Sequence, residues 1–341
     1  MKSGMVLAAG LVLACLLAAC TTQPGRQDRP EWVASQASAW PNSQYLTGRG
    51  SGPTLGQAES RARAALALIL EARIDAEVRD QTRFEGSGKE GGAGQGRIAS
   101  QVTRNISART NQVVRGIEIA DRWQDPASQE YHALAVLKRA SAQQMLRSDI
   151  LRLDQMTAFL VERSRASGEL LAAIAAASRA VEAQAERLAL QRMLQVIDRS
   201  GRGIPAQWSL ARLISDRDAL IGRISIQARA QNSDMPDLAN RLAAALAHAG
   251  FKAPQAGEAI DYVLSVRLDV DDLGRQDGWF WLKGTLSLML QDGEGRERGV
   301  RRWDIKQSGR DPKLAQRRVR DQVDRILEED LRATIIDFAS P

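Results

Sequence analysis

Two cysteines and two histidines are the side chains of this sequence best suited to nucleophilic or metal chemistry. Zinc sites are built from cysteine and histidine ligands that lie close together. Cys15 and Cys20 are near the amino terminus, whereas His132 and His248 are far from them and from each other. His248 comes just before Gly250, where a helix end with a left-handed cap favours a histidine. We therefore expect no catalytic residue, no bound metal and no cofactor.

Two glycine clusters superficially suggest nucleotide binding. In one, Arg83 stands where a P-loop has its first glycine, and Glu90 stands where it has a hydroxyl for magnesium. In the other, Gly48, Gly50 and Gly52 are one residue apart, whereas a dinucleotide fingerprint has its third glycine three residues beyond its second. Neither cluster predicts a nucleotide site. The second is typical of a backbone that another element approaches closely.

An acidic run, residues 269–274, could be taken for a calcium loop. Leu273 and Phe280 occupy positions where such a loop needs oxygen ligands, so calcium binding is not predicted. A solvated hairpin end is the better interpretation. A Gly-x-Ser-x-Gly elbow is also missing from the sequence, so acyl transfer has no recognisable machinery.

The most distinctive surface candidate is the aromatic run Trp279-Phe280-Trp281. In a strand, both tryptophans would point to one face and the phenylalanine to the other. If Trp279 and Trp281 point outward, they form an anchor for a protein partner or a sugar ring. The alternative is that Trp303, on the following strand, stacks across from them as ordinary sheet packing.

The segment before Cys20 has the composition of an export signal. Lys2 is followed by an apolar run over residues 5–17, too short to span a bilayer but suited to a signal peptide. The ending Leu-Ala-Ala-Cys resembles a lipobox, which implies cleavage after Ala19 and lipidation of Cys20. Cys15 lies inside the apolar run and would leave with the signal peptide, residues 1–19.

Residues 20–30 are polar and contain two prolines, which is typical of a short tether. Several acyl chains on Cys20 exceed the two-signal threshold for stable membrane anchoring. Thr21 stands where lipoproteins retained at the inner membrane typically have aspartate. The resemblance therefore implies a protein anchored in the outer membrane, with its folded part in the periplasm.

The composition of the chain indicates a globular protein whose 341 residues suffice for more than one domain. Its net charge of +6 would suggest nucleic acid in a cytosolic protein. An exported protein instead meets lipid headgroups and other envelope components, so nucleic acid is not an expected partner. Once both cysteines are assigned as above, neither a disulfide nor thiol chemistry is expected in the mature body.

Residues 31–140 predict a small α+β domain. A strand at residues 44–51 precedes an amphipathic helix at 55–81, a glycine-rich mobile loop at 84–97, and two antiparallel strands at 113–119 and 130–137. The segments Pro30-Glu31-Trp32-Val33 and Tyr45-Leu46-Thr47-Gly48-Arg49-Gly50, the alanine-rich helix, and Trp123 followed by Tyr131 to Leu137 together resemble the Lpp-twenty lipoprotein family. The resemblance implies a compact domain on an outer-membrane lipoprotein that is not an enzyme.

Residues 141–222 predict an antiparallel helical hairpin. Leu146, Ile150, Leu153, Thr157 and Leu160 recur at coiled-coil spacing. A second stripe starts at Leu170, and residues 164–168 form the break between the two helices. Such stripes are usually core, although a partner-binding zipper is the alternative.

Residues 223–341 predict a second domain, with strands near 223–229, 261–270, 279–291 and 299–307 and helices near 236–248 and 313–337. The fold class is therefore α+β, with two small sheet-plus-helix domains, βαββα and βαβββα, linked by a long hairpin. The second domain resembles periplasmic modules of curli-secretion lipoproteins and of lipoprotein activators of cell-wall synthases.

Three functions are compatible with these expectations. The first is a non-enzymatic scaffold or assembly factor for envelope or surface structures, such as flagellar or secretion components, acting through protein partners. The second is a lipoprotein activator of a peptidoglycan synthase, and the third is an envelope hydrolase, which has the least support. Homo-oligomerisation is left open.

Overall fold

The described residues of the computed structural model form two compact units, one within residues 29–69 and 116–139 and the other within residues 70–85 and 140–339. The structure describes residues 29–35, 38–85, 116–231, 235–255 and 257–339, with only the backbone for 73–85. The predicted signal peptide, Ala19 and Cys20 lie outside the described residues. So does the predicted loop at 84–97, except for its first two residues, which are helical.

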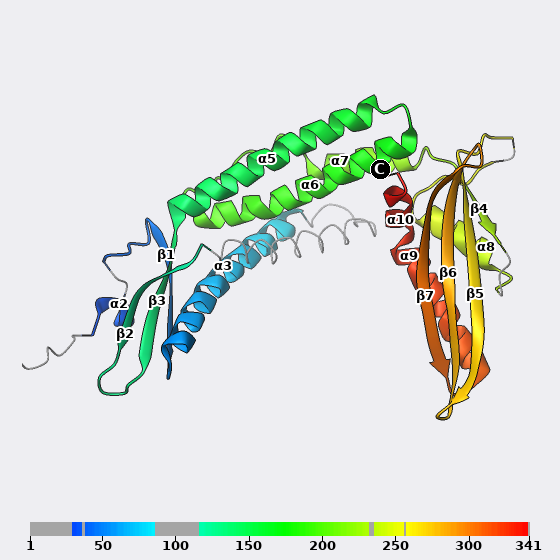
Figure 1. Ribbon diagram of the computed structural model, residues 1–341. Helices are drawn as coiled ribbons and strands as arrows, with labels where there is room; N and C mark the ends of the chain where they lie inside the picture. Colours follow the sequence, from blue (N-terminus) through cyan, green and yellow to red (C-terminus); the bar gives the residue numbers. More distant parts are fainter. Residues whose placement is uncertain (1–28, 36–37, 86–115, 232–234, 256, 340–341) are drawn as a thin grey trace, which may run out of the picture. The chain divides into compact units, whose positions relative to one another are not determined.

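The first unit is built on a three-stranded antiparallel sheet of order β1-β3-β2 (Figure 1). Its strands are β1 (Tyr45–Gly52), β2 (Glu118–Gln124) and β3 (Tyr131–Lys138). A short helix, α2 (Glu31–Ala34), precedes them, and α3 (Leu55–Glu85) follows β1.

The strand predicted at residues 113–119 overlaps β2 but ends too early. Residues 113–115 lie outside the described part of the chain, and β2 runs from Glu118 to Gln124. The ladder extends to this end because Trp123 pairs with His132 on β3 and is buried beside it.

The predicted helical hairpin is confirmed as α5 (Arg139–Ala166) and α6 (Leu170–Ile197), followed by α7 (Leu210–Ile221). The break between α5 and α6, at residues 167–169, overlaps the end of the break predicted at 164–168. The five residues of the first predicted stripe are all buried: Leu146, Ile150, Leu153, Thr157 and Leu160. The stripe is therefore core packing along most of α5, as its periodicity indicates.

A row of polar side chains on α6 holds the segment between α6 and α7. Arg187 is 1% exposed and donates from Nε to Asp154 on α5 at 2.8 Å and from Nη2 to two backbone carbonyls, those of Ile204 and Pro205. Gln191 accepts from the amide of Ile204 at 3.1 Å. Because Arg187 and Gln191 lie on the same face of α6, they hold the return segment, residues 198–209 between α6 and α7, against the hairpin.

The second sheet has four strands in the order β4-β5-β6-β7: β4 (Ile226–Ala230), β5 (Tyr262–Gln276), β6 (Trp279–Asp292) and β7 (Glu297–Gly309). β4 is parallel to β5, and α8 (Leu238–His248) is the crossover between them. The other two pairings are antiparallel. The chain ends with α9 (Pro312–Glu329) and α10 (Leu331–Asp337).

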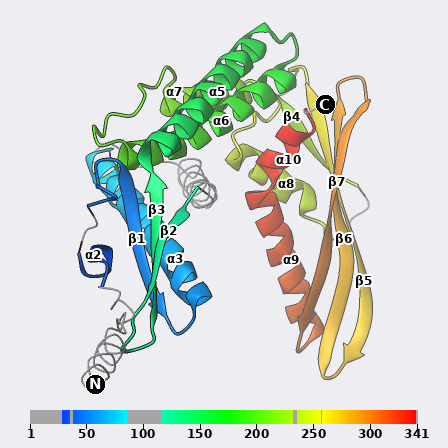
Figure 2. The same cartoon turned by 60° about the vertical axis from the view of Figure 1, so that its left-hand side comes forward.

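Helices of the second unit cover one face of this sheet, and none of the described helices of this unit lies over the other face (Figure 2). Leu264, Val266 and Leu268 of β5 alternate toward the helices and join one core with α8 and α9. Leu171 and Ile174, at the start of α6, belong to the same core. The turn of the hairpin is therefore packed into the second domain rather than joined to it only by a linker.

The hairpin end predicted at residues 269–274 is corrected by the structure. β5 continues to Gln276, with a bulge between Asp272 and Arg275, and the chain reverses at Asp277-Gly278. Both turn residues have positive φ, +50° and +82°. This is the geometry that Asp-Gly favours in a two-residue hairpin turn. β5 therefore extends beyond its predicted end at residue 270, whereas β6 begins at Trp279 as predicted.

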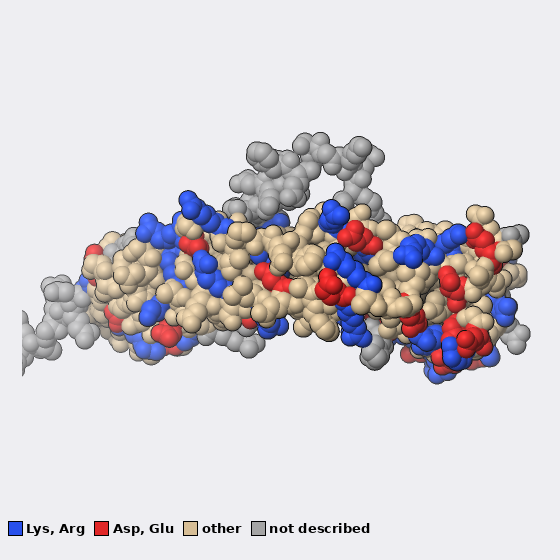
Figure 3. Space-filling view, turned by 90° about the horizontal axis from the view of Figure 1, so that it is seen from above, with Lys and Arg blue, Asp and Glu red and all other residues tan. Residues whose placement is uncertain are grey.

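The surface of the hairpin carries charges of both signs. Seen from above, blue and red side chains alternate with uncharged surface along it, without a field of one sign (Figure 3). Three large apolar side chains of α5 are also exposed: Leu151, Met156 and Phe159. Among the described residues, no helix is both long enough and apolar enough to cross a bilayer.

Candidate docking site

The aromatic run at the start of β6 lies at the end of the second sheet, next to the Asp277-Gly278 turn. Phe280 points to the helical side, where it packs against the core. Trp279 and Trp281 point to the uncovered face, and Trp279 is 37% exposed while Trp281 is half-buried. The alternation predicted for this run is confirmed.

A cation lies over each of these three rings. The Arg310 guanidinium is 6.0 Å from the ring centre of Trp279, and the Lys306 ammonium is 5.3 Å from that of Trp281. Arg275 lies 5.7 Å from the ring centre of Phe280. These distances are within the range of cation–π attraction, which is weak at exposed sites. The stacks orient the rings and leave the cations at the surface.

Trp303 does not stack across from the two tryptophans. The register pairs Trp303 with Leu286 and places Ser308 opposite Trp281. The Trp303 ring packs against the core, and its Nε1 donates to Asp330 at 3.1 Å. The alternative of ordinary sheet packing through Trp303 is therefore wrong, since the extended register separates these residues.

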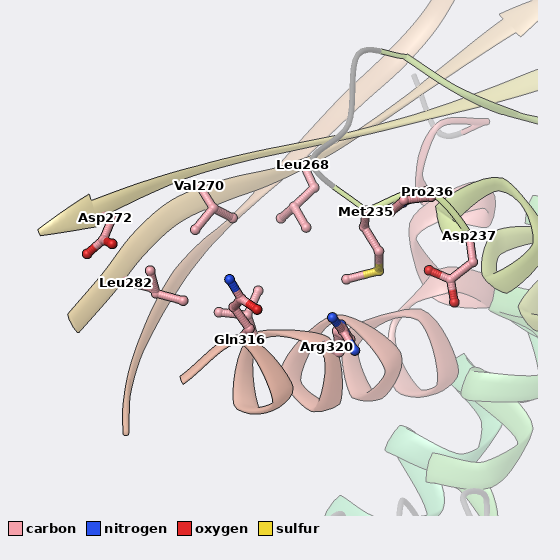
Figure 4. A pocket seen from close by; sticks show the side chains of 10 residues that line it. Met235, Pro236, Asp237, Leu268, Val270, Asp272, Leu282, Gln316 and Arg320 are labelled. Carbon is pink, nitrogen blue, oxygen red and sulfur yellow. The ribbon is translucent and has the colours of Figure 1, made fainter. Parts of the chain in front are cut away.

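A pocket opens at the same end of the sheet, on its helical side, between β5, β6 and α9 (Figure 4). Its volume is about 330 Å³, near the lower end for ligand sites in proteins. Its apolar lining comes from both layers: Met235, Leu268, Val270, Leu282 and Val319. Leu282 directly follows Trp281, so the pocket and the tryptophans lie on opposite faces of one strand.

Polar side chains surround the pocket. Gln316 and Arg320 come from α9, Asp272 from the end of β5, and Asp237 from the start of α8 (Figure 4). Asp237 is engaged by Arg241, whose Nε donates to it at 2.8 Å. By contrast, Arg320 forms no hydrogen bond or ion pair with any described residue. It is the cation at the mouth that remains available to a ligand.

Arg241 ties the helical layer together beside this pocket. Its Nη1 donates to both carboxylate oxygens of Asp324 on α9, at 2.6 and 2.5 Å. These bonds, together with that to Asp237, raise the pKa of the Arg241 guanidinium above its ordinary value. Arg241 therefore stays charged and holds α8 against α9, which keeps the pocket wall in place.

Sequence reasoning did not identify Gln316 and Arg320. Both lie on an arginine-rich amphipathic helix whose charged positions resemble any solvated helix face. Arg318 nearby is engaged by the Ser308 carbonyl at 2.7 Å, so sequence alone does not separate the engaged arginines from Arg320. Only the position of the pocket distinguishes Arg320.

The two histidines, His132 and His248, lie in ordinary positions of a strand and a helix end. His132 lies beside Trp123 with ring centres 5.3 Å apart, and His248 is exposed in the last turn of α8. Gly250 has φ +92°, the left-handed conformation expected after that helix. Within the described ranges, no three His, Cys, Asp or Glu side chains lie where they could share a metal ion.

The glycines of β1 allow α3 to lie against the first sheet. A β-carbon on Gly48 would be 2.6 Å from the Ala62 carbonyl oxygen, and one on Gly50 would be 2.2 Å from the Ala62 amide nitrogen. Ala58, Ala62 and Leu66 are fully buried along this contact. The glycine spacing predicted to permit close backbone approach is thus explained by the helix that follows it.

Residues 30–138 match the family model of the LPP20 lipoproteins. The resemblance predicted from the sequence is thereby confirmed for this segment. The match begins just before α2 and ends with β3, so it spans the whole LPP20 domain. The family assignment is made for this domain alone.

The remaining motif residues of the LPP20 domain pack on the face of its sheet opposite α3. Trp32 and Trp123 are buried there with Leu134 and Val136 of β3. Trp32 donates from Nε1 to Asp121 at 2.7 Å. The Glu31-Trp32-Val33 segment therefore covers part of the second face of the sheet through Trp32.

Three solved structures are similar in part. The secreted protein HP1454 of Helicobacter pylori is 13% identical, with 83% of this chain and 96% of that chain covered and a TM-score of 0.43. A predicted lipoprotein of Caulobacter crescentus CB15 is 22% identical, covering 36% and 96%, with a TM-score of 0.24. A minor lipoprotein of Acinetobacter baumannii is 17% identical, covering 33% and 87%, also at 0.24. At these TM-scores none of them defines the fold or function. No curated protein matches the chain.

Proposed function

We propose that the mature protein is a non-enzymatic scaffold, anchored by lipid on Cys20 in the outer membrane, that recruits other envelope proteins through its second domain. The observation that carries the recruiting role is the exposure of Trp279 beside Trp281 on the uncovered face of the sheet. The anchoring role rests on the lipobox-like sequence and on the lipoprotein family of the LPP20 domain.

Exposed tryptophan and arginine side chains are the types that contribute most binding free energy at protein interfaces. Here Trp279, Trp281 and Arg310 lie together at one end of a sheet. Glu169, between the two hairpin helices, accepts hydrogen bonds from Tyr262 at the other end of β5 and from Arg298 on β7. The two ends of the sheet thus have different roles, since one joins the hairpin and the other is available for a partner.

Anchoring follows from the chemistry of the tether. Acyl chains on Cys20 would hold the amino terminus in the bilayer, and residues 20–30 would separate the LPP20 domain from it. Thr21 in place of aspartate favours sorting to the outer membrane, with the folded part in the periplasm. A scaffold placed in this way needs no reaction of its own, only contacts.

Site-specific photo-crosslinking in intact cells tests the recruiting role. A photoreactive amino acid replaces Trp279 in one variant and Met156, which is 45% exposed on α5, in a matched control. We expect a discrete crosslinked protein from position 279 that is lost when Trp281→Ala is added and is absent from position 156. Identical products from both positions, or none from position 279, would contradict the proposal.

The identity of the crosslinked protein separates the two binding functions. A flagellar or secretion component favours the scaffold, whereas a peptidoglycan synthase favours the activator. A crosslink to a second copy of this chain would identify a homo-oligomer that uses the same surface.

A further inference from the structure

We propose that the partner of the second domain presents an acidic segment with an apolar side chain, and that this side chain enters the pocket between α9 and β5. The inference rests on the proposed docking function and names the chemistry of the partner. It is carried by three observations: the charge of this end of the domain, the available Arg320, and the apolar lining of the pocket.

The end of the domain that holds the pocket is strongly basic. Residues 271–283 and 306–320 contain eight Lys or Arg residues and four Asp residues, a net charge of +4 in a chain whose total is +6. Two of the four acids are already engaged, since Asp272 accepts from the Gly274 amide and Asp311 caps α9. Because opposite charge attracts and orients a partner, this end favours an acidic surface.

The cations at this end are mostly not neutralised by carboxylates of the same domain. Lys306 and Arg310 lie over tryptophan rings, and Arg318 donates to a backbone carbonyl. Arg320 has no polar partner among the described residues. A guanidinium without a polar partner at the mouth of a pocket can form a bidentate hydrogen-bonded pair with a carboxylate.

The pocket supplies the apolar half of the recognition. Its volume of about 330 Å³ can admit an apolar side chain, and Leu268, Leu282 and Val319 provide the walls for it. Gln316 at the rim can donate and accept hydrogen bonds, which suits the backbone of an extended segment. A segment with an apolar residue beside an acidic one would satisfy the lining and Arg320 together.

An anionic bilayer is the competing source of negative charge. A lipid surface would be attracted by the same cations and by the exposed Trp279. However, the pocket lies between the sheet and α9, and a flat surface would leave its apolar lining unused (Figure 4). An acidic protein segment accounts for the apolar pocket and for Arg320 at its mouth together, so it is the occupant we infer.

Defined peptides can test this with the full-length mature chain, made soluble by Cys20→Ser. The probes are a fluorescent peptide of alternating Asp and Leu, one with Lys in place of Asp, and one with Ser in place of Leu. Anisotropy titrations should show that the Asp/Leu peptide binds tightest and that salt weakens its binding. Equal binding of the Lys/Leu peptide would overturn the inference.

Two substitutions on α9 locate the contact. Arg320→Glu reverses the charge at the mouth, and Gln316→Trp places a large side chain across it; both positions are exposed, so the fold should be preserved. Each should weaken binding of the Asp/Leu peptide about tenfold or more. Arg325→Glu, an exposed charge reversal on α9 away from the pocket, should change it less than about twofold. Unchanged binding in both pocket variants would overturn the inference.

Binding to lipid vesicles tests the alternative that an anionic bilayer, and not an acidic protein segment, occupies this site. Sedimentation with phosphatidylglycerol vesicles, but no binding of the Asp/Leu peptide, would assign the site to lipid and overturn the inference. A crosslinked protein at position 279 whose yield is unaffected by Arg320→Glu and Gln316→Trp would leave the proposed function standing while contradicting this pocket. Loss of the crosslink in the two pocket variants supports both.

Discussion

Gly50 of β1 lies so close to Ala62 of α3 that a β-carbon on Gly50 would be 2.2 Å from the Ala62 amide nitrogen. The atom in contact is backbone, so no side-chain rotation can relieve it. Gly48 makes the same kind of contact, 2.6 Å from the Ala62 carbonyl oxygen. The LPP20 domain is therefore held by a helix that rests directly on the glycines of a strand.

The first prediction concerns this contact. Gly50→Ala should destabilise the LPP20 domain by about 1–3 kcal/mol, because α3 must move away from the sheet to admit the methyl group. Chemical denaturation followed by circular dichroism measures the change. Gly56, in the first turn of α3, has no atom within 4 Å of an added β-carbon. Gly56→Ala should thus be neutral or stabilising by up to about 1 kcal/mol, and equal losses in both variants would refute the contact.

The second prediction concerns the buried arginine of the hairpin. The Arg187 side chain is 2% exposed and its partner Asp154 is 15% exposed. Arg187→Met should cost about 3 kcal/mol or more, because it leaves the Asp154 carboxylate and two carbonyls of the return segment without their donor. Thermal or denaturant unfolding measures this loss.

An exposed ion pair of the same hairpin is the control for Arg187. Arg165 and Glu162 form a bond at 2.9 Å with side chains 65% and 70% exposed, so Arg165→Ala should cost less than about 1 kcal/mol. Adding Asp154→Leu to Arg187→Met should recover part of the lost stability, since the stranded charge is then removed. If the double variant is less stable than Arg187→Met alone, the stranded carboxylate is not the cause.

The third prediction concerns pH. Burial, with the Glu169 carboxylate as a further cause, raises the pKa of the Tyr262 phenol from 10.0 to about 12. The folded state therefore holds this proton more tightly than the unfolded state. The resulting stability is fully present below pH 10 and is lost as the pH rises from 10 toward 12.

Ultraviolet absorbance of tyrosinate reports this titration. The chain has three tyrosines, so Tyr262→Phe should remove the component that titrates near pH 12. Glu169→Gln should shift that component to lower pH while keeping a hydrogen-bonding group at the site. A late component that survives Tyr262→Phe would show that another group is responsible.

Local periodicity predicted the helices well because their burial repeats along the chain. The stripe from Leu146 to Leu160 is read from its spacing alone, and it is buried as predicted. Arg187 and Gln191, by contrast, look like solvated positions of α6, and only the return segment that folds over them makes them structural. Contacts with a segment of no regular structure leave no periodic signal in either partner.

Strand pairing was harder to predict for a different reason. The alternation of Trp279, Phe280 and Trp281 is local and was predicted correctly. Whether Trp303 lies across from them depends on the register between β6 and β7, which is set by the turn that joins these two strands after Asp292. The pocket could not be predicted from the sequence either, because Leu268, Leu282 and Arg320 are brought together only by the packing of α9 on the sheet.

Labelling with radioactive palmitate followed by membrane fractionation tests most directly whether lipid on Cys20 anchors this protein in the outer membrane. The unaltered chain and Cys15→Ser should both incorporate label and sediment with the outer membrane, since only Cys20 is the predicted acceptor. Cys20→Ser should lose the label and the membrane association together. Label and sedimentation that are unchanged in Cys20→Ser would contradict the account.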